Sequence, residues 1–402
     1  MVTQLTRPIA PTAQQLQQTQ QRIDTYVNTI ASNPDRREGA FPYYLFHKAG
    51  TPIQGTVLMF HGFSAKPHQM SRLADYLFGN GFNVYQATLA GHTYKLPDRY
   101  WPQVDLKPEI LVPLRQKVSA DPVLQHFLAN VAIADDVGAA TPTPVQMVGL
   151  MARLRKLEPR LLDIIAAIET DNDPDFDRYF VSSHLDYLSD AQARLAELEA
   201  LPGPIYTVGL SVGGAVALAL AAKNPQRVTK VVAFAPLLEV YGGETRKRYI
   251  NLAGPLDVKE FGWDELRFPL GCFTAANRFG AFVRRSEQIS ALRPLPTLML
   301  LTENEDAADL QTNQRFNQSL GRASIFKRYD NHFLHTFPSE ALVPHPMVDP
   351  LEISQNMSND YWQPMYQETF RFLSQTQFKG SSLAEITPAP DLPAVPPIAA
   401  QS

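Results

Sequence analysis

The sequence predicts an α/β protein built on a mostly parallel sheet with helices on both faces. Apolar runs of strand length alternate with helix-length segments along most of the chain. Within several of these runs consecutive positions are apolar, which is typical of strands buried on both faces. The chain has 402 residues, of which 45% are hydrophobic, so it can bury a large core and still carry an insertion.

Each element follows from a local pattern. Residues 12–33 are Gln-rich with a sparse apolar stripe, which predicts an amphipathic helix. Two strands are expected at PYYLFHKAG and TVLMFHGF, then a helix at HQMSRLADYLFGNG that ends on Gly81. The elements expected after it are the strand FNVYQATLA, helix DYLSDAQARLAELEAL, strand IYTVGL, a small-residue helix to Ala222, strands KVVAFAPL and PTLMLL, helix DLQTNQRFNQSL, strand ASIFKRY and a last helix over about residues 353–376.

Segments outside this alternation divide the chain. The stretch that separates the strand FNVYQATLA from the next helix is too long for an ordinary connection. The C-terminal stretch is rich in Pro, Ala and Ser, which predicts a flexible tail. The predicted organisation is an N-terminal helical extension (1–40), a core in two parts (41–92 and 184–378), a helical insertion (93–183) and a Pro/Ala-rich flexible tail (379–402).

The insertion at residues 93–183 is expected to form a lid. It leaves from the carboxyl end of a strand, and ligands in open α/β sheets bind at that edge. Its apolar stripes, Met147 to Leu157 and Leu161 to Ile168, provide an adaptable surface for an acyl chain. A helical subdomain that never touches substrate is the alternative.

Composition and charge exclude several classes of protein. The net charge of −4 gives no electrostatic reason to expect a nucleic acid or an anionic membrane as partner. A single cysteine, Cys272, rules out an intramolecular disulfide, and no Cys/His cluster has zinc spacing. The N-terminus lacks the apolar segment of a signal peptide, and no window approaches the roughly 18 apolar residues of a membrane span. We therefore expect a cytoplasmic protein.

A serine stands where a buried strand gives way to a helix. Residues Gly209–Gly213 read G-x-S-x-G, follow the strand IYTV and open a helix of small residues. A serine at a sharp strand-to-helix turn leaves no room for bulk at the flanking positions, which explains the glycines. The turn exposes the hydroxyl at a helix N-terminus, where N–H groups favour a developing negative charge. The motif predicts that Ser211 is a nucleophile.

The serine needs a base and an orienting acid, which follow it along the chain in the order acid, then histidine. The acid is expected after the strand PTLMLL, in the loop TENEDAADL. Glu305 has the spacing of the acid in related enzymes, whereas Asp306 is the commoner residue type. Asp306 is therefore preferred, with Glu305 as the alternative.

The base is expected directly after the final strand. His332 fits because it follows ASIFKRY within a turn-forming context, while His335 is expected to be a supporting or surface residue. An oxyanion hole is expected from the backbone N–H groups of Phe63 and Val212. His61, beside Phe63, is expected to support that loop by hydrogen bonding rather than to act as a base.

Taken together, these motifs resemble the α/β-hydrolase superfamily, and within it the carboxylesterase, monoacylglycerol lipase and lysophospholipase-like serine hydrolases. The resemblance rests on five short motifs in order, HGF, LAGHT, GLSVGG, TENEDAAD and NHFLH, and covers about residues 43–92 and 184–376. Two features depart from the family pattern. The loop reads Gly91-His92-Thr93 where GHG is usual, and the largest insertion precedes the elbow helix.

The resemblance implies a serine hydrolase that cleaves carboxylic esters through an acyl-enzyme, using a Ser-His-Asp/Glu triad and no cofactor or metal. The expected partner is a small-molecule ester with an apolar acyl group. The alternatives are an acyltransferase, thioesterase or amidase that uses the same triad, and a catalytically silent protein that uses the hydrolase fold for binding.

Overall fold

The computed structural model describes residues 9–126, 143–170, 173–242, 246, 250–251, 259–261, 266–324 and 327–384. Contacts divide the chain into two compact units. The first unit comprises Met1–Lys95, Asp186–Glu239 and Phe279–Ser402, and the second comprises Leu96–Leu185 and Val240–Arg278. Residues 240–278, which the sequence analysis assigned to the core, therefore group with the predicted insertion.

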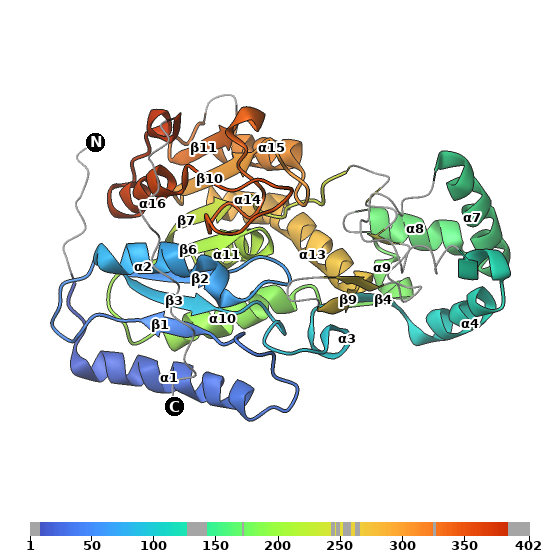
Figure 1. The fold of residues 1–402 in the computed structure, drawn as a ribbon, viewed down its shortest axis with the longest axis horizontal. Coiled ribbons are helices and arrows are strands. Elements are labelled where there is room, and N and C mark those ends of the chain that lie inside the picture. Colours follow the sequence, from blue (N-terminus) through green and yellow to red (C-terminus); the bar gives the residue numbers. More distant parts are fainter. Residues whose placement is uncertain are drawn as a thin grey trace. The chain divides into compact units, whose positions relative to one another are not determined.

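The first unit is built on a seven-stranded sheet in the order β1-β3-β2-β6-β7-β10-β11 (Figure 1). The first strand pairs antiparallel with its neighbour, and all other neighbouring pairs are parallel. This arrangement confirms the mostly parallel sheet that the apolar runs predicted. The strands are β1 Tyr43–Leu45, β2 Thr56–Phe60, β3 Asn83–Ala87, β6 Ile205–Leu210, β7 Val228–Phe234, β10 Thr297–Thr302 and β11 His332–Phe337.

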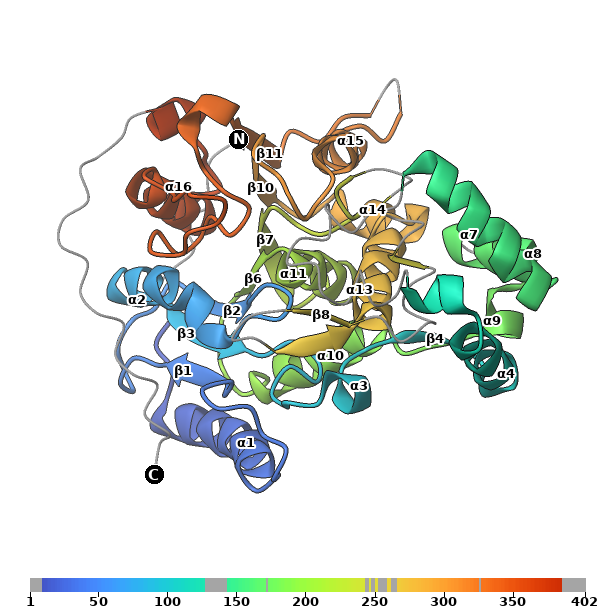
Figure 2. The ribbon, with the colours of Figure 1, turned by 45° about the vertical axis from the view of Figure 1, so that its right-hand side comes forward.

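Helices cover both faces of this sheet, as Figure 2 shows. On one face α2 and α16 share a core with the strands, in which Leu77 and Phe372 meet Val57 and Val208. On the other face α11 packs against β2, β6 and β7. The helices are α1 Ala13–Ala31, α2 Ser71–Gly79, α10 Asp186–Glu197, α11 Val212–Lys223, α14 Ser286–Leu292, α15 Leu310–Gly321 and α16 Trp362–Gln375, with 3-10 turns at Pro67–Met70, Ser339–Ala341 and Gly380–Ala384.

The N-terminal helix has the amphipathic character that its sequence predicts. Thr12 caps α1 in a reciprocal arrangement with Gln15, and the sparse apolar stripe supplies the buried residues Leu16, Ile23 and Ile30. The helix packs against α10. The extension is therefore part of the first unit rather than a separate appendage.

The second unit has a core of its own. The apolar stripes of α7 and α8 lie in one buried cluster that includes Leu150, Leu154, Leu161 and Ile165. These stripes therefore already have apolar partners inside the unit. Its elements are α3 Pro97–Tyr100, β4 Val104–Leu106, α4 Pro108–Ser119, α7 Pro144–Leu157, α8 Leu161–Glu169, α9 Phe176–Tyr179, β5 Phe180–Ser182, β8 Lys259–Phe261 and β9 Arg267–Pro269, while α13 Leu270–Val283 continues into the first unit.

Two expectations near the C-terminus differ from the structure. The final strand is β11, His332–Phe337. The described residues of ASIFKRY form no strand of their own, and Arg328 makes only an isolated bridge with Arg322, the residue before this run. The predicted flexible tail begins with an ordered turn, because Leu383 is buried in the core cluster. Most of the tail, 385–402, lies outside the described residues, as do 127–142 and 171–172 of the insertion. No helix in the described ranges is long and apolar enough to cross a membrane.

Candidate active site

Ser211 lies on the turn between β6 and α11, and its backbone is strained. Its φ of 56° and ψ of −121° are values that residues other than glycine rarely adopt. Flanking bonds hold the turn, because the Ser211 N–H donates to the Phe234 carbonyl and the Leu237 N–H donates to the Ser211 carbonyl, each at 2.9 Å. The turn places Ser211 as the N-cap of α11, where helix N–H groups favour an anion.

The two glycines that flank Ser211 are required by close backbone packing. A Cβ on Gly209 would lie 2.1 Å from the Gly213 carbonyl oxygen, and a Cβ on Gly213 would lie 2.3 Å from the His61 carbonyl oxygen. Both contacts are with backbone, which cannot move aside as a flexible side chain can. The start of α11 is thereby packed directly against the end of β2.

The loop after β2, residues 61–65, borders the serine and is held at several points. Gly62 lies so close to Ser211 that a Cβ on Gly62 would be 3.7 Å from the serine Cβ. The Gly62 N–H donates to Gln69 Oε1 at 2.8 Å. The Leu89 N–H donates to His61 Nε2 at 3.1 Å, so Nδ1 carries the proton and donates to the Gly62 carbonyl at 2.8 Å.

The same loop is held from a second side by Arg37, which belongs to the N-terminal extension. Its guanidinium donates to the Ser64 carbonyl at 2.8 Å and to the Ala65 carbonyl at 3.1 Å. Ser64 needs such support because its φ is +59°.

Burial lowers the pKa of His61 to about 3, so this histidine stays neutral and acts as a structural hydrogen-bonding group, as predicted from the sequence.

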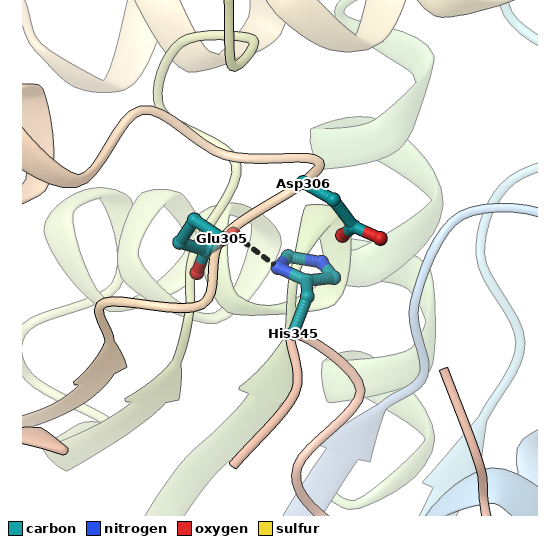
Figure 3. Close-up of side chains that lie close together, drawn as sticks. All are labelled: Glu305, Asp306 and His345. Atoms are coloured by element: carbon teal, nitrogen blue, oxygen red, sulfur yellow. Dashed lines mark hydrogen bonds and ion pairs between the residues drawn. The ribbon is translucent and has the colours of Figure 1, made fainter. Parts of the chain in front are cut away.

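A buried acid–base pair lies in the loops that follow β10 and β11. His345 Nδ1 donates to Glu305 Oε2 at 2.7 Å, and the exposed fractions of the two side chains are 10% and 2% (Figure 3). The backbone sets this proximity, because an isolated parallel bridge between Asn304 and Pro344 brings the residues just before Glu305 and His345 side by side. The Ala308 N–H also donates to Glu305 Oε2, at 3.1 Å, and fixes the carboxylate.

Charges around His345 favour its protonated form. Burial alone would lower the pKa of His345, but the Glu305 carboxylate and its hydrogen bond raise it above the ordinary value overall. Asp306 and Glu352 add smaller electrostatic contributions in the same direction. The imidazole is therefore a strong proton acceptor that an acid orients through Nδ1, as a general base requires.

Asp306, the acid preferred from the sequence, has other hydrogen-bond partners. Its Oδ2 accepts from Gln355 Nε2 at 2.9 Å and from Ser354 Oγ at 3.5 Å. Figure 3 shows its carboxylate on the opposite side of the His345 ring from Glu305. The residue hydrogen-bonded to His345 is thus Glu305, the alternative acid, and Asp306 is a neighbouring charge.

His332, the predicted base, lies at the opposite end of the sheet from Ser211. His332 pairs with Thr297, the first residue of β10, and Thr297 is in register with Val231 of β7 and Thr207 of β6. Thr207 lies four residues before the serine. Both ring nitrogens are engaged, Nδ1 with Thr297 Oγ1 at 2.8 Å and Nε2 with the Arg293 carbonyl at 3.0 Å. Burial lowers the pKa of His332 to about 4. The structure does not bring this residue to the serine.

The misplaced final strand explains this difference. The base was expected directly after the last strand, and the last strand is β11 instead of ASIFKRY. The histidine that then follows is His345, in the segment VPHPM, which the sequence analysis did not consider. His335 lies within β11 and packs against the rings of Phe337 and Phe378, with centroids 4.7 and 6.4 Å away.

Of the two predicted oxyanion donors, Val212 follows the serine directly in the chain, and Phe63 follows Gly62, which lies beside Ser211. Val212 is the first residue of α11, so its N–H has no acceptor within the helix. Phe63 follows Gly62 in the loop that borders Ser211, and its ring packs edge-on against His92 at 5.5 Å. The role of these two N–H groups as oxyanion donors stays a prediction.

Glu305, Asp306 and His345 are also the one group in the described ranges whose ligand atoms, all within 4.8 Å of one another, could surround a metal ion. In this structure His345 Nδ1 donates to Glu305 Oε2 at 2.7 Å, so we describe the two residues as an acid–base pair.

Comparisons with known proteins agree with this topology. The family model described as the alpha/beta hydrolase fold matches residues 55–253, and the model of the Esterase family matches residues 179–341. No curated protein matches the sequence.

Solved structures with a similar arrangement have low sequence identity. One, from work on the metagenome-derived lipolytic enzymes LipS and LipT, is 15% identical over 84% of this chain and 98% of its own, with a TM-score of 0.46. The monoglyceride lipase of Saccharomyces cerevisiae is 13% identical over 84% of this chain and 92% of its own, with a TM-score of 0.47. The monoacylglycerol lipase of Paleococcus ferrophilus is also 13% identical, over 84% and 99%, with a TM-score of 0.44.

Proposed function

This chain belongs to the α/β-hydrolase superfamily, and from that premise we propose that it is a serine hydrolase that cleaves carboxylic esters. The observation that carries the proposal is the strained serine at the elbow, together with a buried histidine that an acid orients through Nδ1. Ser211 follows β6 and Glu305 follows β10, so parallel strands bring both residues to the same edge of the sheet.

In the proposed reaction Ser211 attacks the ester carbonyl while His345 Nε2 removes the hydroxyl proton. Glu305 holds the imidazole in the tautomer with Nδ1 protonated and stabilises the imidazolium that forms. The oxyanion of the tetrahedral intermediate accepts hydrogen bonds from the N–H groups of Phe63 and Val212. His345 then returns the proton to the leaving alcohol, and water releases the acyl group by the same steps.

The loop geometry supports the oxyanion hole. Removing one donor of this kind typically costs about 2.7–4 kcal/mol of transition-state stabilisation, so a mobile loop would forfeit most of the catalysis. The clamps on residues 61–65 by Arg37, His61 and Gln69 hold the Phe63 N–H in place before substrate arrives.

The test is labelling with a fluorophosphonate, which reacts with activated serines. We expect the wild-type protein to be labelled and the Ser211→Ala variant to be unlabelled, with an unchanged circular dichroism spectrum. Turnover should be measured on p-nitrophenyl esters from acetate to palmitate, and on a thioester and an amide with the same acyl group. Turnover by a folded Ser211→Ala protein close to the wild-type rate would exclude the proposed mechanism.

We also propose, as the sequence suggested, that residues 93–183 act as a lid that selects apolar acyl groups. Because the buried stripes pack within the second unit, its exposed apolar residues Val148 and Leu162 are the appropriate positions to change. A lid predicts that Leu162→Ser slows hydrolysis of decanoate esters more than that of acetate esters. Equal effects on both esters would make the insertion a scaffold.

A further inference from the structure

Gln69 connects the loop beside the serine with the segment that carries the base. Its Oε1 accepts from the Gly62 N–H at 2.8 Å, while its Nε2 donates to both carboxylate oxygens of Glu352, at 3.0 and 2.9 Å. The side chain is buried, with 5% of the residue exposed. Gln69 therefore joins the loop to a residue that lies 283 positions after Gln69 in the chain.

The two partners fix which way round the amide lies. A carboxylate only accepts hydrogen bonds, so the Gln69 NH₂ group must face Glu352. The amide oxygen is then left to face Gly62, whose N–H only donates. Leaving the buried NH₂ group without an acceptor would cost free energy, so Glu352 favours the orientation in which the Gln69 amide oxygen accepts from Gly62.

The bond to Gly62 acts on the proposed oxyanion hole. Gly62 is the residue before Phe63, so the orientation of the Gly62 backbone fixes the peptide that carries the Phe63 N–H. A Cβ placed on Gly62 would lie 3.1 Å from Gln69 Oε1 and 3.7 Å from the Ser211 Cβ. Gln69 therefore contacts the loop on the side that faces the nucleophile. In enzymes generally, a displacement of about 1 Å at a reacting group can cost about 100-fold in rate.

We propose that Gln69 is a positioning residue of the oxyanion hole and that Glu352 holds the Gln69 amide in its working orientation. This inference rests on the proposed function. Glu352 reaches the base as well, because its charge is one of the three that raise the pKa of His345. One hydrogen-bonded unit thus spans the region between the oxyanion loop and the segment of the general base.

A second link between the same two segments provides a matched control. Arg72 Nε donates to Asp349 Oδ1 at 3.0 Å, and the exposed fractions of the two side chains are 9% and 15%. Arg72 lies on α2, three positions after Gln69, and Asp349 lies three positions before Glu352. This ion pair ties the same two segments together at a point three positions away from the Gln69–Glu352 contact. Its loss therefore reports the cost of loosening the segments alone.

The variants are Gln69→Met, which keeps the length of the side chain but neither hydrogen bond, Glu352→Leu, Glu352→Gln and Asp349→Asn. The readouts are kcat, KM, melting temperature and the affinity for phenylboronic acid, which forms a tetrahedral adduct with an active serine. All are measured on the alkaline plateau of the pH profile, where the charge of Glu352 no longer changes the fraction of neutral His345.

We expect Gln69→Met and Glu352→Leu to lower kcat about 10- to 100-fold and to lower the affinity for phenylboronic acid by a similar factor. KM should stay within about twofold of wild type. Glu352→Gln should retain most of the kcat, because its amide oxygen can still accept from Gln69 Nε2. Asp349→Asn should lower the melting temperature but leave kcat within about twofold. If Gln69→Met fails to fold, the comparison of Glu352→Leu with Glu352→Gln decides the question.

The positioning role is overturned if Gln69→Met keeps the wild-type kcat and boronic acid affinity, or if Asp349→Asn loses as much kcat as Gln69→Met. It is also overturned if Glu352→Gln is as slow as Glu352→Leu. Failure of the proposed function is recognised separately, because a wild-type protein that neither turns over esters nor reacts with the fluorophosphonate at Ser211 leaves no oxyanion hole to position.

Discussion

The exchange of the predicted base for another histidine can be tested directly by comparing His345→Ala with His332→Ala. A general base must lie within about 2.6–3.2 Å of the proton that it removes, or act through one water. His332 is four residues below the level of Ser211 and three strands across the sheet from β6. With a rise of about 3.3 Å per residue and a strand spacing of about 4.8 Å, the two Cα atoms are about 20 Å apart.

The two substitutions should therefore affect different quantities. His345→Ala removes the proton acceptor, and loss of the histidine from a serine protease triad costs about 10⁶-fold in kcat, so we expect a loss of about 10⁴- to 10⁶-fold. His332→Ala removes two hydrogen bonds and leaves Thr297 Oγ1 and the Arg293 carbonyl without that partner. That change should cost about 1–3 kcal/mol of stability and leave kcat within about twofold.

The assay is hydrolysis of p-nitrophenyl butyrate, with urea unfolding of each variant as the measure of stability. The double variant Ser211→Ala/His345→Ala should be little slower than either single variant, since members of a catalytic unit are strongly non-additive. A folded His345→Ala protein with near wild-type turnover, or a more than tenfold loss of kcat in folded His332→Ala, would refute the assignment of the base.

Three further predictions concern the acid, the pH profile and the elbow. Glu305→Gln should lower kcat by about 10⁴-fold, as in a related triad, and Asp306→Asn by less than about tenfold; the reverse order in steady-state kinetics would return the role to Asp306. Because the base acts in its neutral form and the pKa of His345 is raised, kcat/KM should rise with pH through a pKa above the ordinary histidine value. Asp306→Asn should move that pKa downward, and an unchanged or higher value in the pH profile would contradict this. Gly213→Ala should cost several kcal/mol in urea unfolding or prevent folding, because its Cβ would lie 2.3 and 2.4 Å from the His61 and Phe60 carbonyl oxygens. Wild-type stability would disprove the close packing.

Most of the sheet and the nucleophile could be predicted because they depend on local patterns. The elbow combines a buried strand, a glycine-flanked serine and a small-residue helix within a single short segment, Val208–Ala222. The final strand could not be placed in this way. ASIFKRY and HFLHTF are adjacent apolar runs of similar strand propensity, and the choice between them depends on which one pairs with β10.

The rest of the site depends on contacts between distant parts of the chain. The turn after β10 decides whether Glu305 or Asp306 faces the imidazole, and neighbouring carboxylates offer no local pattern that distinguishes them. Gln69 and Glu352 meet only because the loops after β2 and β11 converge in the folded protein. Sequence periodicity carries no information about such a pair.

The bonds from Arg37 to the loop after β2 have a consequence for shortened forms of this protein. Residues 1–40 contribute no strand to the sheet, so they could be taken for a segment that can be deleted. However, the Arg37 guanidinium donates to the Ser64 and Ala65 carbonyls, and the Arg37 N–H donates to the Thr93 carbonyl. Cleavage by a protease just after Arg37 would leave α1 and Arg37 attached to the core only through non-covalent contacts, such as those of α1 with α10. A truncated protein that still melted cooperatively would then lack a support of the loop beside Ser211, and it would lose turnover before it lost its fold.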